Sequence, residues 1–401
     1  MMFDVRAHYA QAALANVRLW QRRLLASEAP VDRWQAQQDA IWQAVADGLS
    51  IAAAQEEAAR LAADAHPTLE EWGVWPNWLP LLETAVALDL PPELKGCLLL
   101  AQGRGCTLNR NFADAIRLEE AALALAEAHQ FPTLAARAHQ RLTNACLGDK
   151  AYAAARQHGA AALRLLLPTP STTLAALFST LGLLELETGN YRMSEAQFQQ
   201  ALALWSGLNR PIQLARTALN LGVLYQQQNR LNRARACYEL AYAALAPTAS
   251  MVDKLKVLNG LGILHYMLKE MPQAEAVFRR GVAAAQALKG AFHLRGSLTH
   301  NLGNTLLSLE RWEESHFYLE KSIRLWQQAD DAVQQANSMG TLGEWYERRG
   351  EWETAVTHYD EALALLAKYP GHQWAQRVAV QFREARTRCA AQRAHVSTHW
   401  G

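Results

Sequence analysis

Apolar residues recur along the chain at helical spacing, and one arrangement of large and small residues occurs seven times. In each copy a small residue is followed nine residues later by a large apolar residue, and then by small residues after three and after seven more. The first small position is occupied by Gly103, Thr143, Gly182, Gly222, Gly262, Gly303 and Gly343. The large position is occupied by Phe112, Tyr152, Tyr191, Leu231, Met271, Trp312 and Trp352. The last small position is occupied by Ala122, Ala162, Ala201, Ala241, Gly281, Ser322 and Ala362. Successive copies are 39 to 41 residues apart, and such a period is typical of a solenoid of repeated units.

This spacing predicts pairs of antiparallel helices that pack closely. Small residues let the two backbones approach, and the large residue at the start of the second helix is expected to fill the space between the pair. The last small residue is expected to lie where the next pair docks. A glycine inside a helix costs about 1 kcal/mol relative to alanine, so its presence in six of seven copies indicates a steric need. The alternative is a run of unrelated amphipathic helices. It does not explain why all seven copies share the same four positions of small and large residues.

Leucine precedes the glycine on the first helix of five copies, and an aromatic residue follows on the second helix of several. The leucine–glycine pairs are Leu181-Gly182, Leu221-Gly222, Leu261-Gly262, Leu302-Gly303 and Leu342-Gly343, and the aromatic residues include Phe198, Tyr238, Phe278 and Tyr359. With these features, residues 92–368 resemble the tetratricopeptide repeat family. The resemblance implies an all-α fold, a right-handed superhelical solenoid of antiparallel helix pairs with helical caps, whose first helices line a concave groove.

The repeats are about six residues longer than the usual 34-residue unit of that family. In this they are similar to the sensor arms of bacterial signal-transduction ATPases and of MalT-like regulators. No GxxxxGK[ST] phosphate-binding motif is present in the chain, so an ATPase domain is not expected here.

The predicted organisation has five segments. Residues 1–49 form an N-terminal cap of two helices, broken near Pro30. Residues 50–91 form a diverged helix pair, with one helix closed at His66-Pro67 and a second over 69–88. About seven repeats occupy residues 92–368, a capping helix 369–394, and a frayed tail 395–401.

The composition indicates which partners and which compartment to expect. The net charge of +1 gives no reason to expect nucleic acid or an anionic membrane as a partner. No apolar stretch of 18 residues is present, so no membrane span is expected. Five cysteines occur without a CxxC pair, which favours small buried thiols and a cytoplasmic protein. The resemblance to sensor arms of bacterial ATPases implies that the protein is bacterial.

No arrangement of residues in the sequence indicates catalysis. The chain lacks HExxH and any Cys/His cluster at metal-ligand spacing. The GxG at Gly103 lies inside a predicted helix without the preceding strand that a dinucleotide site needs. We therefore expect no catalytic residue, no metal and no cofactor.

The candidate binding residues flank the small first-helix positions and should face the groove. They are Asn144, Thr180, Asn220, Gln226, Asn259, Tyr266, Asn301, Asn304, Thr341, Glu344 and Arg348. Asparagine amides suit an extended backbone because each offers donors and an acceptor, although some of these asparagines could only satisfy neighbouring repeats.

The favoured function is a non-enzymatic scaffold that binds a peptide or protein segment in its groove, in signalling or complex assembly. The alternative is a sensor arm that binds a small ligand, a sugar or a nucleotide, and reports to a signal-transduction ATPase or a transcription regulator. An enzyme with an unrecognised site is the third reading.

Overall fold

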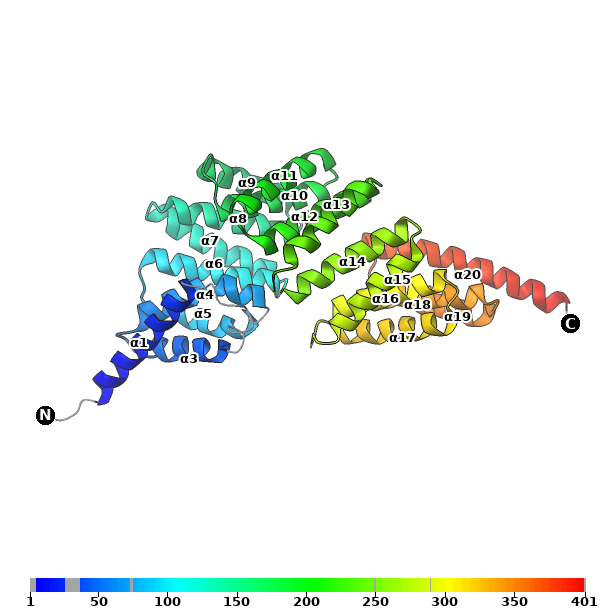
Figure 1. The fold of residues 1–401 in the computed structure, drawn as a ribbon, viewed down its shortest axis with the longest axis horizontal. Helices are drawn as coiled ribbons and strands as arrows, with labels where there is room; N and C mark the ends of the chain where they lie inside the picture. Colours follow the sequence, from blue (N-terminus) through cyan, green and yellow to red (C-terminus); the bar gives the residue numbers. More distant parts are fainter. Residues whose placement is uncertain (1–4, 26–36, 73–74, 249, 289, 400–401) are drawn as a thin grey trace. The chain divides into compact units, whose positions relative to one another are not determined.

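The computed structural model describes residues 5–25, 37–72, 75–248, 250–288 and 290–399 (Figure 1). Within these ranges the chain consists of helices and connecting turns, with no β-strand, which confirms the predicted all-α solenoid of helix pairs. The first helices of the repeats are α6 (Pro92–Leu108), α8 (Pro132–Gly148), α10 (Thr172–Glu187), α12 (Pro211–Gln227), α14 (Met251–Met267), α16 (Phe292–Ser308) and α18 (Ala332–Arg348). The second helices are α7 (Phe112–Ala128), α9 (Tyr152–Leu166), α11 (Tyr191–Gly207), α13 (Leu231–Leu245), α15 (Met271–Ala285), α17 (Trp312–Gln328) and α19 (Trp352–Leu366).

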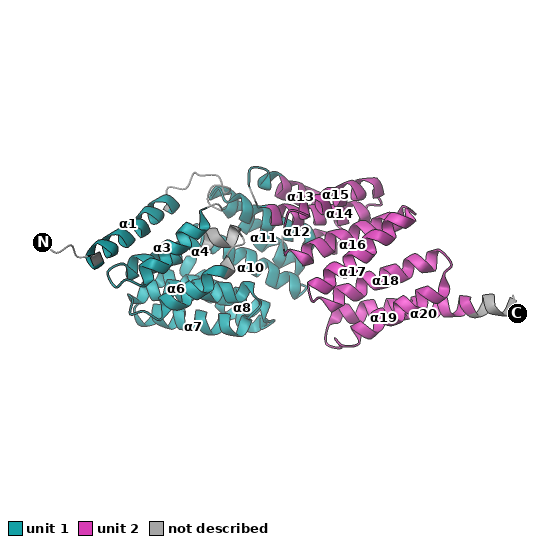
Figure 2. Cartoon of the chain, turned by 90° about the horizontal axis from the view of Figure 1, so that it is seen from below, with its two compact units in different colours: residues 1–224, 243–250 teal, residues 225–242, 251–401 magenta. Residues whose placement is uncertain are grey.

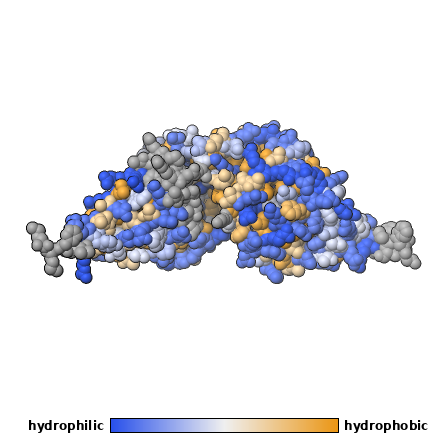
Figure 3. Space-filling view, turned by 60° about the horizontal axis from the view of Figure 1, so that its bottom comes forward, coloured by the Kyte–Doolittle hydropathy of each residue, from blue (hydrophilic) through white to orange (hydrophobic). Residues whose placement is uncertain are grey.

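The chain divides into two compact units, coloured separately in Figure 2. Unit 1 comprises residues 1–224 and 243–250, and unit 2 comprises residues 225–242 and 251–401. Hydrophilic residues cover much of the face drawn in Figure 3, with small apolar patches among them. None of the helices in the described ranges is long and apolar enough to cross a membrane.

Each second helix begins at the large residue predicted for it, because the turn before it has a fixed geometry. Two residues before each of these starts, the backbone is left-handed, as at Arg110 (φ 61°), Gly189 (φ 80°) and Gly350 (φ 75°). The following N–H then donates to a carbonyl five residues earlier, as from Asn190 to Glu185 at 2.8 Å. This is the Schellman ending of a helix, which satisfies carbonyls that have no partner inside the helix.

Within a pair, the glycine of the first helix faces the residue sixteen positions later on the second. A Cβ added to Gly182 would lie 2.5 Å from Phe198, and one added to Gly343 would lie 3.0 Å from Tyr359. Both ring side chains are buried. The predicted steric need for glycine is therefore confirmed, since any larger residue would push the ring away.

The role predicted for the large residue is wrong. Phe112 packs against Gly148 on the first helix of the next repeat, and the Trp312 carbonyl accepts a 2.9 Å hydrogen bond from Trp345 on α18. The space inside each pair is already filled by the side chain that faces the glycine. The predicted role of the last small position holds at Gly281, whose added Cβ would lie 2.8 Å from Leu298 of the next pair.

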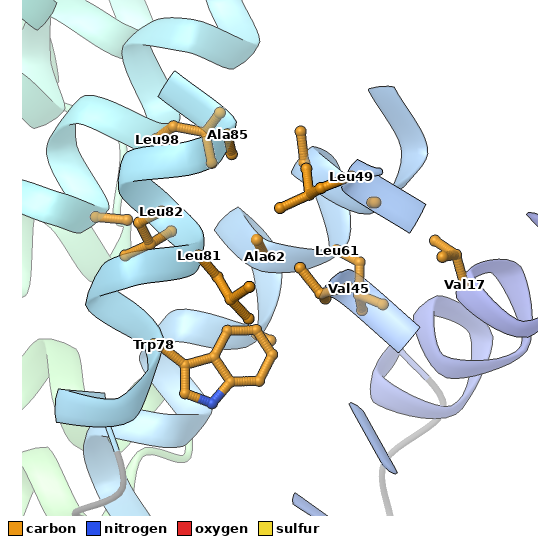
Figure 4. Packing of buried hydrophobic residues seen from close by; sticks show 14 of the residues in the cluster. Val17, Val45, Leu49, Leu61, Ala62, Trp78, Leu81, Leu82, Ala85 and Leu98 are labelled. Atoms are coloured by element: carbon orange, nitrogen blue, oxygen red, sulfur yellow. The ribbon is translucent and has the colours of Figure 1, made fainter. Parts of the chain in front are cut away.

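Ahead of the repeats, unit 1 contains α1 (Val5–Leu25), α3 (Gln38–Leu49), α4 (Gln55–Trp72), the 3₁₀ turn η1 (Trp75–Trp78) and α5 (Leu79–Val86). Their shared core gathers Val17, Val45, Leu61, Trp78 and Leu82 (Figure 4). The predicted break near Pro30 lies outside the described residues.

Two predicted boundaries ahead of the repeats are wrong. Helix α4 continues through His66-Pro67 to Trp72, because a proline removes one backbone donor without stopping every helix. The helix predicted over 69–88 is instead divided among the end of α4, η1 and α5, and Pro80 lies in the first turn of α5, where a missing N–H costs little.

The last helix, α20 (Gln373–His399), caps unit 2. Its Val378 and Cys389 are buried against the last repeat, and Phe382 packs against Gly340. The helix runs through His399, so the frayed tail predicted from residue 395 is wrong up to that point. No glycine or proline interrupts residues 373–399, and nothing in the sequence ends the helix sooner.

Candidate functional site

Seven candidate residues of unit 2 lie on three neighbouring first helices, α14, α16 and α18, and the eighth, Gln226, lies at the end of α12. Asn301 Nδ2 on α16 donates to Asn259 Oδ1 on α14 over 2.9 Å, and both side chains are half-buried. Among the described residues, Asn259 Nδ2 and Asn301 Oδ1 have no other partner. The pair therefore combines a fixed orientation with one free donor and one free acceptor.

A histidine extends this pair into a polar row, formed by Asn259, Asn301, His300 and Asn337, that reaches from α14 to α18. His300 Nδ1 lies 3.0 Å from Ser338 Oγ, and its Nε2 lies 3.3 Å from Asn337 Nδ2. An amide nitrogen only donates, so Nε2 is the acceptor and Nδ1 carries the hydrogen. Burial lowers the pKa of His300 to about 4, which keeps the ring neutral at pH 7. Asn337 was missed by the sequence analysis, although it lies one helical turn before Thr341.

Tyr266 and Asn304 are also half-buried in this region. Ser308 donates to the Asn304 carbonyl at 3.1 Å, so the Tyr266 hydroxyl, 3.0 Å from Ser308 Oγ, is the donor in that contact. Tyr266 is thus tied to α16 at its polar end. The Asn304 side chain makes no hydrogen bond within the described residues and remains able to bind a ligand.

Two other candidates have their polar groups occupied. Gln226 Oε1 accepts from the Tyr238 hydroxyl, and Gln226 Nε2 lies 3.2 Å from Met267 Sδ. Thr180 of unit 1 is buried and donates to the Ala176 carbonyl at 3.0 Å, so its predicted place in the groove is wrong. Threonine is short, and its hydroxyl readily bonds the preceding turn of its own helix.

Asn144 and Asn220 belong to unit 1, where both side chains are half-buried. Their amides make no hydrogen bond within the described residues.

The remaining candidates, Thr341, Glu344 and Arg348, line a cavity of about 420 Å³ in unit 2. Tyr359 donates to Glu347 Oε2 at its base over 2.8 Å. Burial, followed by this hydrogen bond, raises the pKa of Tyr359 above its usual range. The rest of the lining is Gly340, Gln381, Phe382, Glu384, Ala385 and Arg388.

The described residues contain no group of three histidine, cysteine, aspartate or glutamate side chains placed to bind a metal ion. The polar row offers amides, hydroxyls and one neutral imidazole, which suit hydrogen bonding to a ligand.

The comparisons with known proteins agree with this architecture. Tetratricopeptide repeat models match residues 173–246, 253–328 and 338–373. No curated protein matches the chain.

Among solved structures, a signal transduction ATPase with numerous domains and a tetratricopeptide repeat sensor, from Pyrococcus horikoshii, is similar with a TM-score of 0.68 and 13% identity. That match covers 92% of this chain and 54% of the ATPase, so this chain spans about half of that protein. The apo quorum sensor NprR from B. thuringiensis has a TM-score of 0.58 and 15% identity, over 88% of this chain and 98% of its own. A Rap protein complexed with competence and sporulation factor has a TM-score of 0.58 and 13% identity, over 90% and 98%.

At these identities the solved structures show a common fold and nothing finer. The repeat models add the sequence signature, and the glycine contacts explain it in physical terms. The chain contains tetratricopeptide repeats at residues 173–246, 253–328 and 338–373.

Proposed function

We propose that this chain is a non-enzymatic scaffold that binds an extended segment of a partner protein along α14, α16 and α18 of unit 2. The observation that carries the proposal is the row of half-buried amides at Asn259, Asn301 and Asn304. An amide with a free donor or acceptor can bond the N–H or C=O groups of an extended backbone without selecting its side chains.

Side chains that are already ordered in the free chain support this role. The Asn301–Asn259 bond and the contacts of His300 fix side chains before a partner arrives. A site whose rotamers are already ordered loses less entropy on binding. The Rap protein of similar fold, complexed with competence and sporulation factor, is a precedent for binding by such a solenoid.

A sensor arm is the second candidate. It is favoured by the likeness to the Pyrococcus horikoshii ATPase, whose sensor is a tetratricopeptide repeat. In that role the same row would bind a small ligand such as a sugar or a nucleotide, and a larger assembly would read out the binding.

The test compares a double variant, Asn259→Ala with Asn301→Ala, with the wild type. Peptides are first selected from a random displayed library on the wild-type chain, and their dissociation constants are then measured by fluorescence anisotropy. Two lost hydrogen bonds of about 1 kcal/mol each predict a roughly thirtyfold weaker complex. Asn232→Ala is the matched control, because Asn232 is exposed on the second helix α13.

Unchanged affinity in the double variant would remove the groove proposal, as would a selection that enriches no peptide. In the second case, stabilisation of the wild type by a nucleotide or a sugar in a thermal shift assay, lost in the double variant, would favour the sensor arm.

A further inference from the structure

The cavity of unit 2 is built where the capping helix α20 meets α18 and α19. Gly340 has no side chain, so Phe382 of α20 packs directly on the α18 backbone. The rings of Phe382 and Tyr359 lie with their centroids 5.9 Å apart at an angle of 39° and form the apolar base. The volume of about 420 Å³ falls in the range of small-ligand and side-chain pockets.

The cavity is continuous with the polar row. Asn337, Thr341, Glu344 and Arg348 follow one another at helical spacing, so they share one face of α18. Asn337 belongs to the row through His300, and the other three line the cavity. An extended segment lying along this face therefore passes the mouth of the cavity.

Each arginine of the lining is paired with a glutamate of the lining. Arg348 Nε and Nη2 lie 3.0 Å and 2.6 Å from Glu344 Oε1. Arg388 Nε and Nη2 lie 3.3 Å and 3.2 Å from Glu347 Oε1, and the other Glu347 oxygen accepts from Tyr359. Both guanidinium charges are therefore neutralised within the cavity.

The carboxylates of the lining outnumber its guanidinium groups, so the net charge of the lining is negative. Glu384 on α20 lines the cavity, is exposed, and has no ion-pair or hydrogen-bond partner among the described residues. Glu344 Oε2 also has no partner there. An anion would have to displace a paired glutamate, whereas a cation meets the unpaired carboxylate of Glu384.

We propose that this cavity binds a cationic side chain, an arginine or a lysine, of the partner segment. That this side chain belongs to a partner protein rests on the proposed function. The carboxylates supply charge-assisted hydrogen bonds, and Phe382 and Tyr359 in the lining offer an apolar contact to the alkyl stem of the side chain.

The test uses the full chain and two probes of the same shape. Butylguanidinium reproduces the end of an arginine side chain, and butylurea is its neutral counterpart. Dissociation constants are measured by ligand-observed saturation-transfer NMR for the wild type, for Glu384→Gln, and for Glu313→Gln. Glu313 is the matched control because it is an exposed glutamate of α17 that does not line the cavity.

We expect saturable binding of butylguanidinium to the wild type and to Glu313→Gln, and binding about three- to fivefold weaker in Glu384→Gln, the scale of one exposed ion pair. Butylurea should bind more weakly than butylguanidinium. No saturable binding, equal binding by both probes, or equal binding by Glu384→Gln and the wild type would each overturn the proposal.

This result is separable from the groove test. The Asn259→Ala and Asn301→Ala double variant should bind butylguanidinium as the wild type does, because neither asparagine lines the cavity. Peptide binding without butylguanidinium binding would remove the cation site and leave the groove. The reverse result would remove the groove and leave a cation site.

Discussion

Glu119 faces Gly103, at the position where several other repeats have an aromatic residue. A carboxyl group at this position should make the stability of the first repeat depend on pH. The Glu119 Cγ would lie 2.8 Å from a Cβ added to Gly103, and both carboxylate oxygens are buried without a hydrogen-bond partner. Burial raises the pKa of Glu119 to about 8, although the positive charges of Arg141 and Arg104 oppose this. At neutral pH the folded repeat therefore contains an uncharged carboxylic acid.

The size of the effect follows from the two pKa values. A rise from 4.5 to about 8 corresponds to about 5 kcal/mol between the protonated and ionised forms of the folded chain. Because the pKa of Glu119 is higher in the folded state, its stabilising contribution is complete below pH 4.5 and is lost as the pH rises through 8. The α6–α7 pair should therefore open more easily at pH 9 than at pH 6.

Hydrogen exchange measured by mass spectrometry can test this repeat separately from the rest of the chain. Exchange of peptides from α6 and α7, corrected for intrinsic rates, gives the free energy of local opening at pH 6 and at pH 9. Burial, with a contribution from Glu119, raises the pKa of the thiols of Cys106 on α6 and Cys146 on α8, so opening of this region also changes their ionisation at high pH. The decisive quantity is therefore the difference in pH dependence between the wild type and Glu119→Gln.

We expect the opening free energy of the wild type to fall from pH 6 to pH 9, and that of Glu119→Gln to fall much less. Peptides from α16 and α17 serve as the internal reference. The same pH dependence in both proteins, or a wild type that becomes harder to open at pH 9, would refute the reasoning about Glu119.

Three further predictions concern unit 2 and the repeat contacts. Gly262→Ala places a methyl group against Phe278 and should cost about 1–3 kcal/mol in denaturant unfolding; Gly207→Ala, which meets nothing within 4 Å, should be neutral or stabilising. Phe278→Ala removes a buried ring and should cost about 3–5 kcal/mol, so an unchanged midpoint would contradict its place between the helices. Glu314→Gln breaks the contact at 2.5 Å with Arg279 and should lower the thermal midpoint at low salt, with the difference disappearing in 1 M salt, about where the Debye length falls to 3 Å; a difference that persists at high salt would show that packing, and not charge, is responsible.

The sequence predicted the helix pairs well because their cause is local. A glycine and the side chain that faces it must recur at fixed spacing, so Gly182 and Phe198 can be read from one chain. The turn at Arg110 could not be read in this way, because a left-handed backbone there is imposed by the helix on each side and not by the residue itself. In the same way, Pro67 alone could not show that α4 continues past it.

The candidate site was predicted less completely. Asn259 and Asn301 were found from their register beside the small first-helix residues, and the structure joins them. Gln226 was chosen by the same rule, yet its amide is used by Tyr238 and Met267, which come from other helices. A register on one helix gives the direction of a side chain and cannot show which neighbours occupy it. The cavity was not foreseen, because five of its eleven lining residues come from α20.

The glycine contact inside each pair also bears on how the chain can fold. The two partners, such as Gly182 and Phe198, are only sixteen residues apart, so the contact closes a short loop at small entropic cost. A chain dominated by such short closures has low contact order and is expected to fold quickly. Folding can therefore start within one helix pair and spread to its neighbours, because each pair is completed by packing on the next.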